Sequence, residues 1–166
     1  MPWAKFIWAR TNLPRNAFIS WVLINHRLPT KQRLTKFQNF TDTQCVLCSA
    51  EDETEDHLFF ACPYAQTVWE KLRQWWTQLP SVQNSTQLLS YVKHDHNNGS
   101  LKQITSALIT AIFYHIWSAR NHKIFKNKQI TASQTAYQVK EQVRSRILYL
   151  NTCSKKFKGC IDRLKS

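Results

Sequence analysis

Four residues with the spacing of metal ligands constrain this chain more than any other feature. Cys45, Cys48, His57 and Cys62 follow the pattern C-x2-C-x8-H-x4-C. Two cysteines separated by two residues can form a turn with both sulfurs on one side, and His57 and Cys62 can complete a tetrahedron from the next helical stretch. Three thiolates and one imidazole suit Zn²⁺. Because the protein fills all four positions, the pattern predicts one structural zinc ion with no coordination position left for water.

Other roles for these cysteines are less consistent with the pattern. Three buried apolar cysteines beside an unrelated His57 would rarely show ligand spacing. A disulfide between Cys45 and Cys48 would close a strained, short loop, and the sequence shows no sign of secretion. Cys153 and Cys160 have no nearby histidine pair and are expected to be free thiols.

The composition and the apolar spacing favour an all-α fold. The chain has 43% hydrophobic residues and only two glycines, so it can bury a core but lacks the turns that a β-sandwich needs. The strongest helical pattern covers residues 100–126, and Thr131 is expected to cap a last helix that reaches Leu150. We expect a small helical domain with one zinc site, followed by a long helix and a C-terminal helix.

This pattern suggests four segments along the chain. Residues 1–80 would form the zinc-binding domain, and residues 81–100 a linker that holds one short helix. Residues 101–152 would form a helical pair that packs on the first domain. Residues 153–166 are basic and poorly patterned, and are expected to form a tail.

The net charge of +13 is unevenly distributed. Residues 1–41 carry seven basic and no acidic side chains, whereas residues 42–80 carry two basic and seven acidic ones. Residues 128–166 carry nine basic and two acidic side chains. Basic ends therefore flank an acidic middle, which favours a polyanionic partner such as RNA, DNA or acidic lipid. No apolar run is long enough to span a membrane. Of these partners we expect a nucleic acid and not a membrane.

The combined motifs resemble the zinc-binding region of plant non-LTR (LINE-type) retrotransposon reverse transcriptases. The resemblance begins at Trp8 and Leu13-Pro14-Arg15, and includes the four metal ligands in the order and spacing of that family. It extends to a W-x2-RN-x2-IF segment at residues 117–125 and covers residues 3–127. It implies binding of the element's RNA or its target DNA by a region that follows a polymerase domain.

Catalytic motifs of that family are missing from the sequence. There is no Tyr-x-Asp-Asp polymerase motif, and no cluster of carboxylates suits the two-metal site of an RNase H. A closed zinc site also argues against a zinc hydrolase. We therefore expect a non-enzymatic module that binds RNA or single-stranded DNA, in the nucleus rather than in the cytoplasm. The acid-free N-terminus would also fit an organelle transit peptide.

The charge distribution separates the zinc site from the expected nucleic-acid contacts. Five carboxylates lie in Glu51–Asp56, which is expected to be a solvated loop that repels phosphate. The basic residues at the two ends of the chain are the candidate contacts. They are Arg10, Arg15, Arg27, Lys31, Arg33, Lys36, Arg144, Arg146, Lys155, Lys156 and Lys158.

Two other functional readings remain open. In one, a host retains the module as an adaptor whose Glu51–Asp56 loop binds a basic protein. In the other, the chain is a fragment of a decayed element without a function. Within the long helix, Arg120 and Asn121 interrupt the apolar pattern, and an internal structural tie is favoured over contact with bases.

Overall fold

The computed structural model describes residues 2–37, 41–94 and 99–165, and these residues fold into helices and connecting loops. Within these ranges there is no β-strand, and only an isolated antiparallel bridge joins Gln44 to Asp52. The all-α prediction is confirmed. The elements are α1 (Pro2–Ile7), α2 (Pro14–Ile24), α3 (Lys31–Leu34), the π-helix η1 (His57–Ala61), α4 (Pro63–Trp75), α5 (Ser85–His94), α6 (Ser100–Lys126), α7 (Ala132–Ser154), the 3₁₀-helix η2 (Lys158–Cys160) and α8 (Ile161–Lys165).

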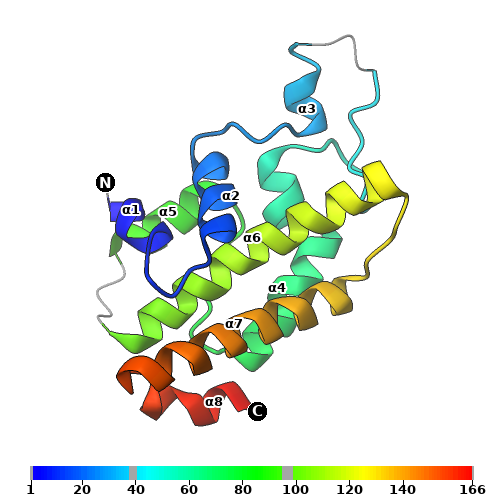
Figure 1. Ribbon diagram of the computed structural model, residues 1–166. Coiled ribbons are helices and arrows are strands. Elements are labelled where there is room, and N and C mark those ends of the chain that lie inside the picture. The colour runs from blue at the N-terminus through cyan, green and yellow to red at the C-terminus, as the bar shows by residue number, and fades with distance from the viewer. Residues whose placement is uncertain (1, 38–40, 95–98, 166) are drawn as a thin grey trace.

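Helix α6 is the centre of the molecule. It runs diagonally across Figure 1, with α2 packed on one side and α7 alongside it on the other. Residues 104–113 of α6 are all buried, because the helix is enclosed by neighbours over this stretch. The helix ends at Lys126 and is followed by Asn127, which has the left-handed conformation that often terminates helices. The expected long helix over residues 100–126 is confirmed.

The predicted last helix is α7, and Thr131 caps it as expected. The Thr131 side chain accepts a hydrogen bond from the Gln134 backbone N–H, and the Gln134 side chain accepts one from the Thr131 backbone N–H. This capping box satisfies two N–H groups that would otherwise lack helical partners. Val139, Val143 and Ile147 are buried, and α7 packs against both α6 and α4.

Two segments expected to be a linker and a tail contain packed helices. Residues 85–94 form α5, which buries Leu88 and Val92 and packs on α1. Residues 95–98, also within the expected linker, lie outside the described residues. In the expected tail, α8 packs on α7 and buries Leu164. Each segment carries too few apolar residues for its packing to be predicted from the sequence. The division of the chain into domains stays a prediction.

The N-terminal segment also packs on the core. Phe6 and Ile7 in α1 are buried, and α1 contacts α2, α5 and α6. Among the described helices, none combines the length and the apolar character that a bilayer span requires.

Candidate metal centre

A tight turn presents the first two candidate ligands, Cys45 and Cys48. The Ser49 backbone N–H donates a hydrogen bond to the Cys45 carbonyl (N···O 2.7 Å), which closes the turn. The Cys45 backbone N–H donates to the Glu51 carbonyl (N···O 2.8 Å), which pairs the two arms of the loop. The turn thereby places both cysteine side chains on the same side, as their spacing predicts.

A π-helical turn presents the other two ligands, His57 and Cys62. The His57 backbone N–H donates to the Thr54 hydroxyl (N···O 2.9 Å), so Thr54 caps this turn. The Cys62 backbone N–H donates to the His57 carbonyl five residues earlier (N···O 2.7 Å). Because a π-helix closes its hydrogen bonds over five residues, this wide turn brings Cys62 round to the level of His57. Pro63 then begins α4.

The four side chains converge on one point. Their ligand atoms all lie within 4.8 Å of one another. The Sγ atoms of Cys45 and Cys62 are 4.0 Å apart, and Cys48 Sγ lies 3.3 Å from His57 Nε2. A tetrahedron with zinc–sulfur bonds of about 2.3 Å has edges of about 3.8 Å, so this group fits a single structural zinc ion. The predicted cofactor and the predicted closed site agree with this geometry.

The protonation of the metal-free site follows from the contact between two thiols. The Cys62 thiol donates a hydrogen bond to the Cys45 thiolate, and with help from the Leu47 and Cys48 backbone N–H groups it lowers the pKa of Cys45 to about 5. The same contact, together with burial, raises the pKa of Cys62. Cys45 is therefore a thiolate at neutral pH, whereas Cys62 retains its proton, which zinc must displace.

An aromatic cluster fixes the π-helix to the core. Phe59 and Phe60 each meet Phe113 of α6 edge to face, with ring centroids 5.5 and 5.8 Å apart. The Trp69 indole N–H of α4 donates to the Phe59 carbonyl (N···O 2.8 Å). Backbone and side chains of η1 are thus held by the two helices beside it, which positions His57 and Cys62.

A buried ion pair connects the zinc loop to α6. Arg120 Nη2 donates to Glu53 Oε1 at 2.7 Å, and both residues are buried, at 3% and 0% exposure. Glu53 Oε1 also accepts from the Lys31 backbone N–H, and Arg120 Nη2 donates to the Pro29 carbonyl. The expected role of Arg120 as an internal tie is confirmed. Sequence reasoning did not identify its partner, because Glu53 lies 67 residues away.

The expected solvated loop at Glu51–Asp56 is wrong for Glu53, which is buried, and for Glu55, which is half-buried. Besides the buried Glu53, Glu55 accepts hydrogen bonds from the Leu28 backbone N–H and contacts the His26 ring. Asp56 accepts from the Ser85 backbone N–H. Backbone donors and Arg120 compensate these carboxylates, so the acidic segment joins distant parts of the chain. Glu51, Asp52 and Asp56 are exposed.

The structure brings some candidate nucleic-acid contacts together from opposite ends of the chain. Arg146 Nη2 of α7 donates to the Arg10 carbonyl (N···O 2.9 Å), across 136 residues of sequence. Ser100 Oγ donates to the Lys156 carbonyl (O···O 2.9 Å). Because Ser100 begins α6, this contact places the 155–158 segment at the N-terminal end of α6. Lys155, Lys156 and Lys158 are exposed.

Other candidates have partners within the protein. Lys31 forms an ion pair with Asp42, and Arg33 donates to the His26 carbonyl. Arg144 lies 3.6 Å from Glu141 on its own helix. Arg15 packs over the Tyr114 ring of α6, with 4.9 Å between the guanidinium carbon and the ring centroid. The remaining two candidates, Arg27 and Lys36, are exposed.

Comparison with known proteins agrees with the metal site. Residues 1–69 match the family model described as zinc-binding in reverse transcriptase. The matched segment contains all four candidate ligands and both turns that position them. The matching model describes a zinc-binding region and not a catalytic domain. No curated protein and no solved structure shows a significant match to the chain.

Proposed function

We propose that the chain is a non-catalytic, zinc-stabilised module that binds RNA or single-stranded DNA. The observation that carries this proposal is the contact between Arg146 and the Arg10 carbonyl. This contact places basic segments from the two ends of the chain on one surface. A combined surface of this kind can follow a phosphate backbone over several nucleotides.

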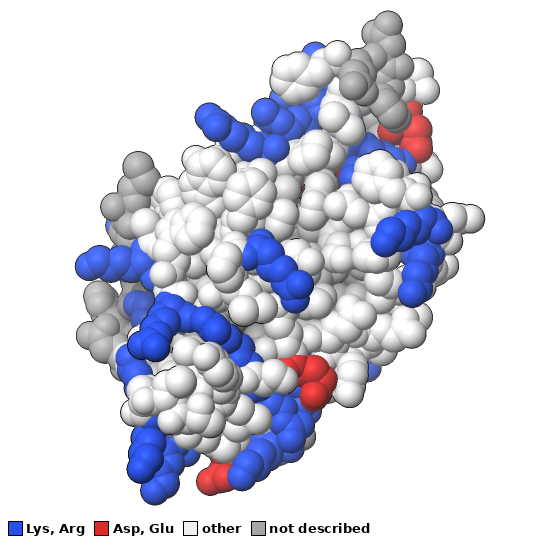
Figure 2. Space-filling model, viewed as in Figure 1, with Lys and Arg blue, Asp and Glu red and all other residues white. Residues whose placement is uncertain are grey.

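This basic surface, which we call the basic end, is formed by Arg10, Arg146, Lys155, Lys156 and Lys158. Three hydrogen bonds hold its segments together. Besides the Arg146–Arg10 and Ser100–Lys156 contacts, Thr11 Oγ1 donates to the Gln103 carbonyl (O···O 3.0 Å). In Figure 2, Lys and Arg side chains gather at the lower left, over the end of the molecule where α7 ends, and acidic atoms are sparse there. The basic end would therefore attract an anionic strand.

Exposed aromatic rings beside cations are the feature of the basic end that suits a nucleic acid. The Arg146 guanidinium lies over the ring of Tyr149, an exposed residue, and Trp8 is exposed two residues before Arg10. Exposed aromatic rings beside cations favour unpaired bases, which can stack on them.

The zinc ion would organise the fold rather than contact phosphate. Three thiolates around Zn²⁺ give the site a negative formal charge, and Glu51 and Asp52 add exposed negative charge beside it. We infer that the module derives from a non-LTR retrotransposon reverse transcriptase of the plant type, because the W-x2-RN-x2-IF segment continues the likeness beyond residue 69. A nuclear location would follow from that origin.

The test is binding of a labelled single-stranded RNA to the zinc-loaded chain over a series of salt concentrations. The logarithm of the association constant should fall as salt rises, by about 0.7 per neutralised phosphate. Reversing Lys155, Lys156 and Lys158 to Glu should weaken binding at least about tenfold and reduce that slope. A slope near zero for the unmodified protein would contradict the proposal.

A matched single substitution controls for the loss of charge alone. Lys156→Glu removes a cation from the basic end, whereas Lys71→Glu removes an exposed cation from α4. Lys156→Glu should weaken binding more than Lys71→Glu. Equal effects would mean that net charge, and not the basic end, determines affinity.

A further inference from the structure

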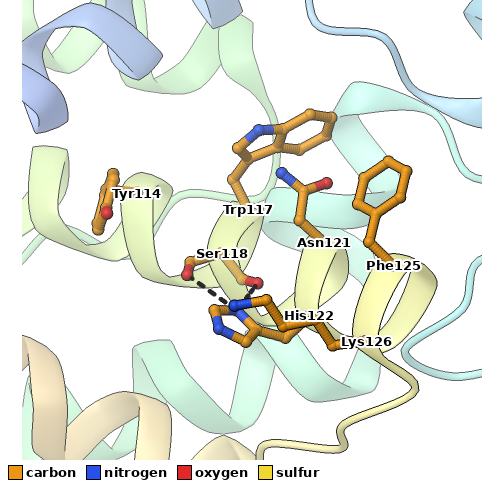
Figure 3. Close-up of a pocket in the computed structure, with 7 residues that line it drawn as sticks. All are labelled: Tyr114, Trp117, Ser118, Asn121, His122, Phe125 and Lys126. Carbon is orange, nitrogen blue, oxygen red and sulfur yellow. Dashed lines mark hydrogen bonds between the residues drawn. The ribbon is translucent and has the colours of Figure 1, made fainter.

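We propose that a pocket on α6 holds one nucleobase of the bound strand, an inference that rests on the proposed function. The pocket has a volume of about 200 Å³, and its lining comes entirely from the second half of α6. Figure 3 shows its main residues, which are Tyr114, Trp117, Asn121, His122, Phe125 and Lys126. Their spacing of three and four residues places them along one side of the helix.

Aromatic rings form the walls of this pocket. In Figure 3, the rings of Trp117 and Phe125 rise from the same side of α6, with the Asn121 amide between them. Trp117 is largely buried, and the Arg120 guanidinium lies 4.7 Å from its ring centroid. Phe125 is 75% exposed, which leaves its ring free to stack on a planar group. The pocket thus offers one fixed wall and one open ring.

The Asn121 amide has a fixed orientation. Arg120 Nη1 donates to Asn121 Oδ1 (N···O 3.0 Å), and Arg120 is itself held by the buried Glu53. The oxygen is therefore engaged, and the Nδ2 group has no acceptor within the part of the chain that the structure describes. An amide donor between two aromatic rings can recognise a carbonyl oxygen or a ring nitrogen on the edge of a base.

The surroundings of the pocket favour a polyanion. Lys126 lines it, and no carboxylate does. At its other end, the Arg15 guanidinium lies over the Tyr114 ring, 4.9 Å from the ring centroid. Along α6, Tyr114 is about 16 Å from Gln103, which contacts the basic end. A strand bound at the basic end could therefore reach the pocket by way of Arg15.

A proline-rich peptide is the other occupant that an aromatic pocket could accept. The cations near Tyr114 and Phe125, together with the missing carboxylates, favour the nucleic acid. The two occupants are distinguished by titrating each into the zinc-loaded chain and following the Asn121 side-chain amide signal by NMR. A shift with single-stranded RNA supports the proposal. A shift with the peptide and none with RNA overturns it.

The binding experiment uses Phe125→Ala with Tyr137→Ala as its control. Tyr137 is a similarly exposed aromatic residue, at 65%, but lies on α7 outside the pocket. With a single-stranded RNA of about 12 nucleotides, Phe125→Ala should weaken binding about 5- to 150-fold, the usual effect of losing one stacked base. The salt slope should not change, because stacking neutralises no phosphate. Tyr137→Ala should have less than about a twofold effect.

The outcomes separate this inference from the proposed function. If the unmodified protein binds with the expected salt dependence and Phe125→Ala equals Tyr137→Ala, the pocket proposal is wrong and the proposed function stands. If the unmodified protein binds no single strand, both are wrong. Asn121→Ala adds a readout of base recognition, since it should change the ranking of oligo(A), oligo(U) and oligo(C). An unchanged ranking would exclude Asn121 as a base contact.

Discussion

At the scale of single residues, the ion pair between Glu53 and Arg120 is the connection on which several parts of the molecule depend. Glu53 accepts from the backbone N–H of Lys31, the first residue of α3, and Arg120 donates to Pro29 and to Asn121. The pair therefore links the zinc loop, the segment before α3 and the pocket on α6. Its two charges compensate each other inside the protein, and each needs the other to remain buried.

Removing one member of this pair should destabilise the fold. Arg120→Ala leaves the Glu53 carboxylate buried without its cation, which should cost about 3–5 kcal/mol in the free energy of unfolding. Chemical denaturation of the zinc-loaded protein measures this change. Arg27→Ala removes an exposed arginine and should cost less than about 0.5 kcal/mol. Similar losses for the two variants would show that the buried pair has no such role.

At the scale of elements, α5 shows how a short helix is recruited into the core. Its sequence has few apolar residues, and its neighbour α1 has only six residues. Each helix is too short to be stable alone in water. Packed together, they bury Phe6, Ile7, Leu88 and Val92. Packing, and not helix propensity, therefore stabilises this part of the molecule.

Two adjacent leucines test whether α5 belongs to the core. Leu88 is buried and Leu89 is half-exposed. Leu88→Ala should lower the free energy of unfolding by about 2–5 kcal/mol because it leaves a cavity, and Leu89→Ala should have a smaller effect. Chemical denaturation compares the two variants. If residues 85–94 behaved as a linker, both substitutions would have the same small effect.

At the scale of the whole molecule, the zinc site and the helical core are parts of one structure. The π-helix that holds His57 and Cys62 also carries Phe59 and Phe60 into the core beside α6. Loss of the metal would therefore release residues that the core needs. Structural zinc contributes directly to the free energy of folding in such cases.

Removal of zinc should lower the melting temperature of the whole chain. Elemental analysis should find about one zinc per chain, and Cys48→Ser or His57→Ala should remove it, whereas Cys153→Ser should not. Zinc affinity should also fall by at least about tenfold for each pH unit below neutrality. The reason is that Cys62, whose pKa is raised, retains its proton until zinc displaces it. Competition with a chelator at several pH values measures this. Unchanged melting after chelation would contradict a structural role.

Local patterns made much of the fold and the metal site predictable. Ligand spacing identified Cys45, Cys48, His57 and Cys62, and apolar periodicity with the Thr131 cap identified α6 and α7. These features are encoded within one or two turns of chain. The burial of Glu53 had no such signal, because a carboxylate in an acidic segment has the pattern of a solvated loop.

The sequence by itself determined the ligand set, the helical class and the positions of the long helices, since each depends on neighbours close along the chain. Only the tertiary structure decided which distant residues meet. It paired Glu53 with Arg120 across 67 residues and Arg146 with Arg10 across 136. Such pairs form because helices packed around α6 bring them together, and the order of residues does not record that packing. The pocket on α6 depends on the same packing, because Glu53 from the zinc loop holds Arg120, which orients Asn121.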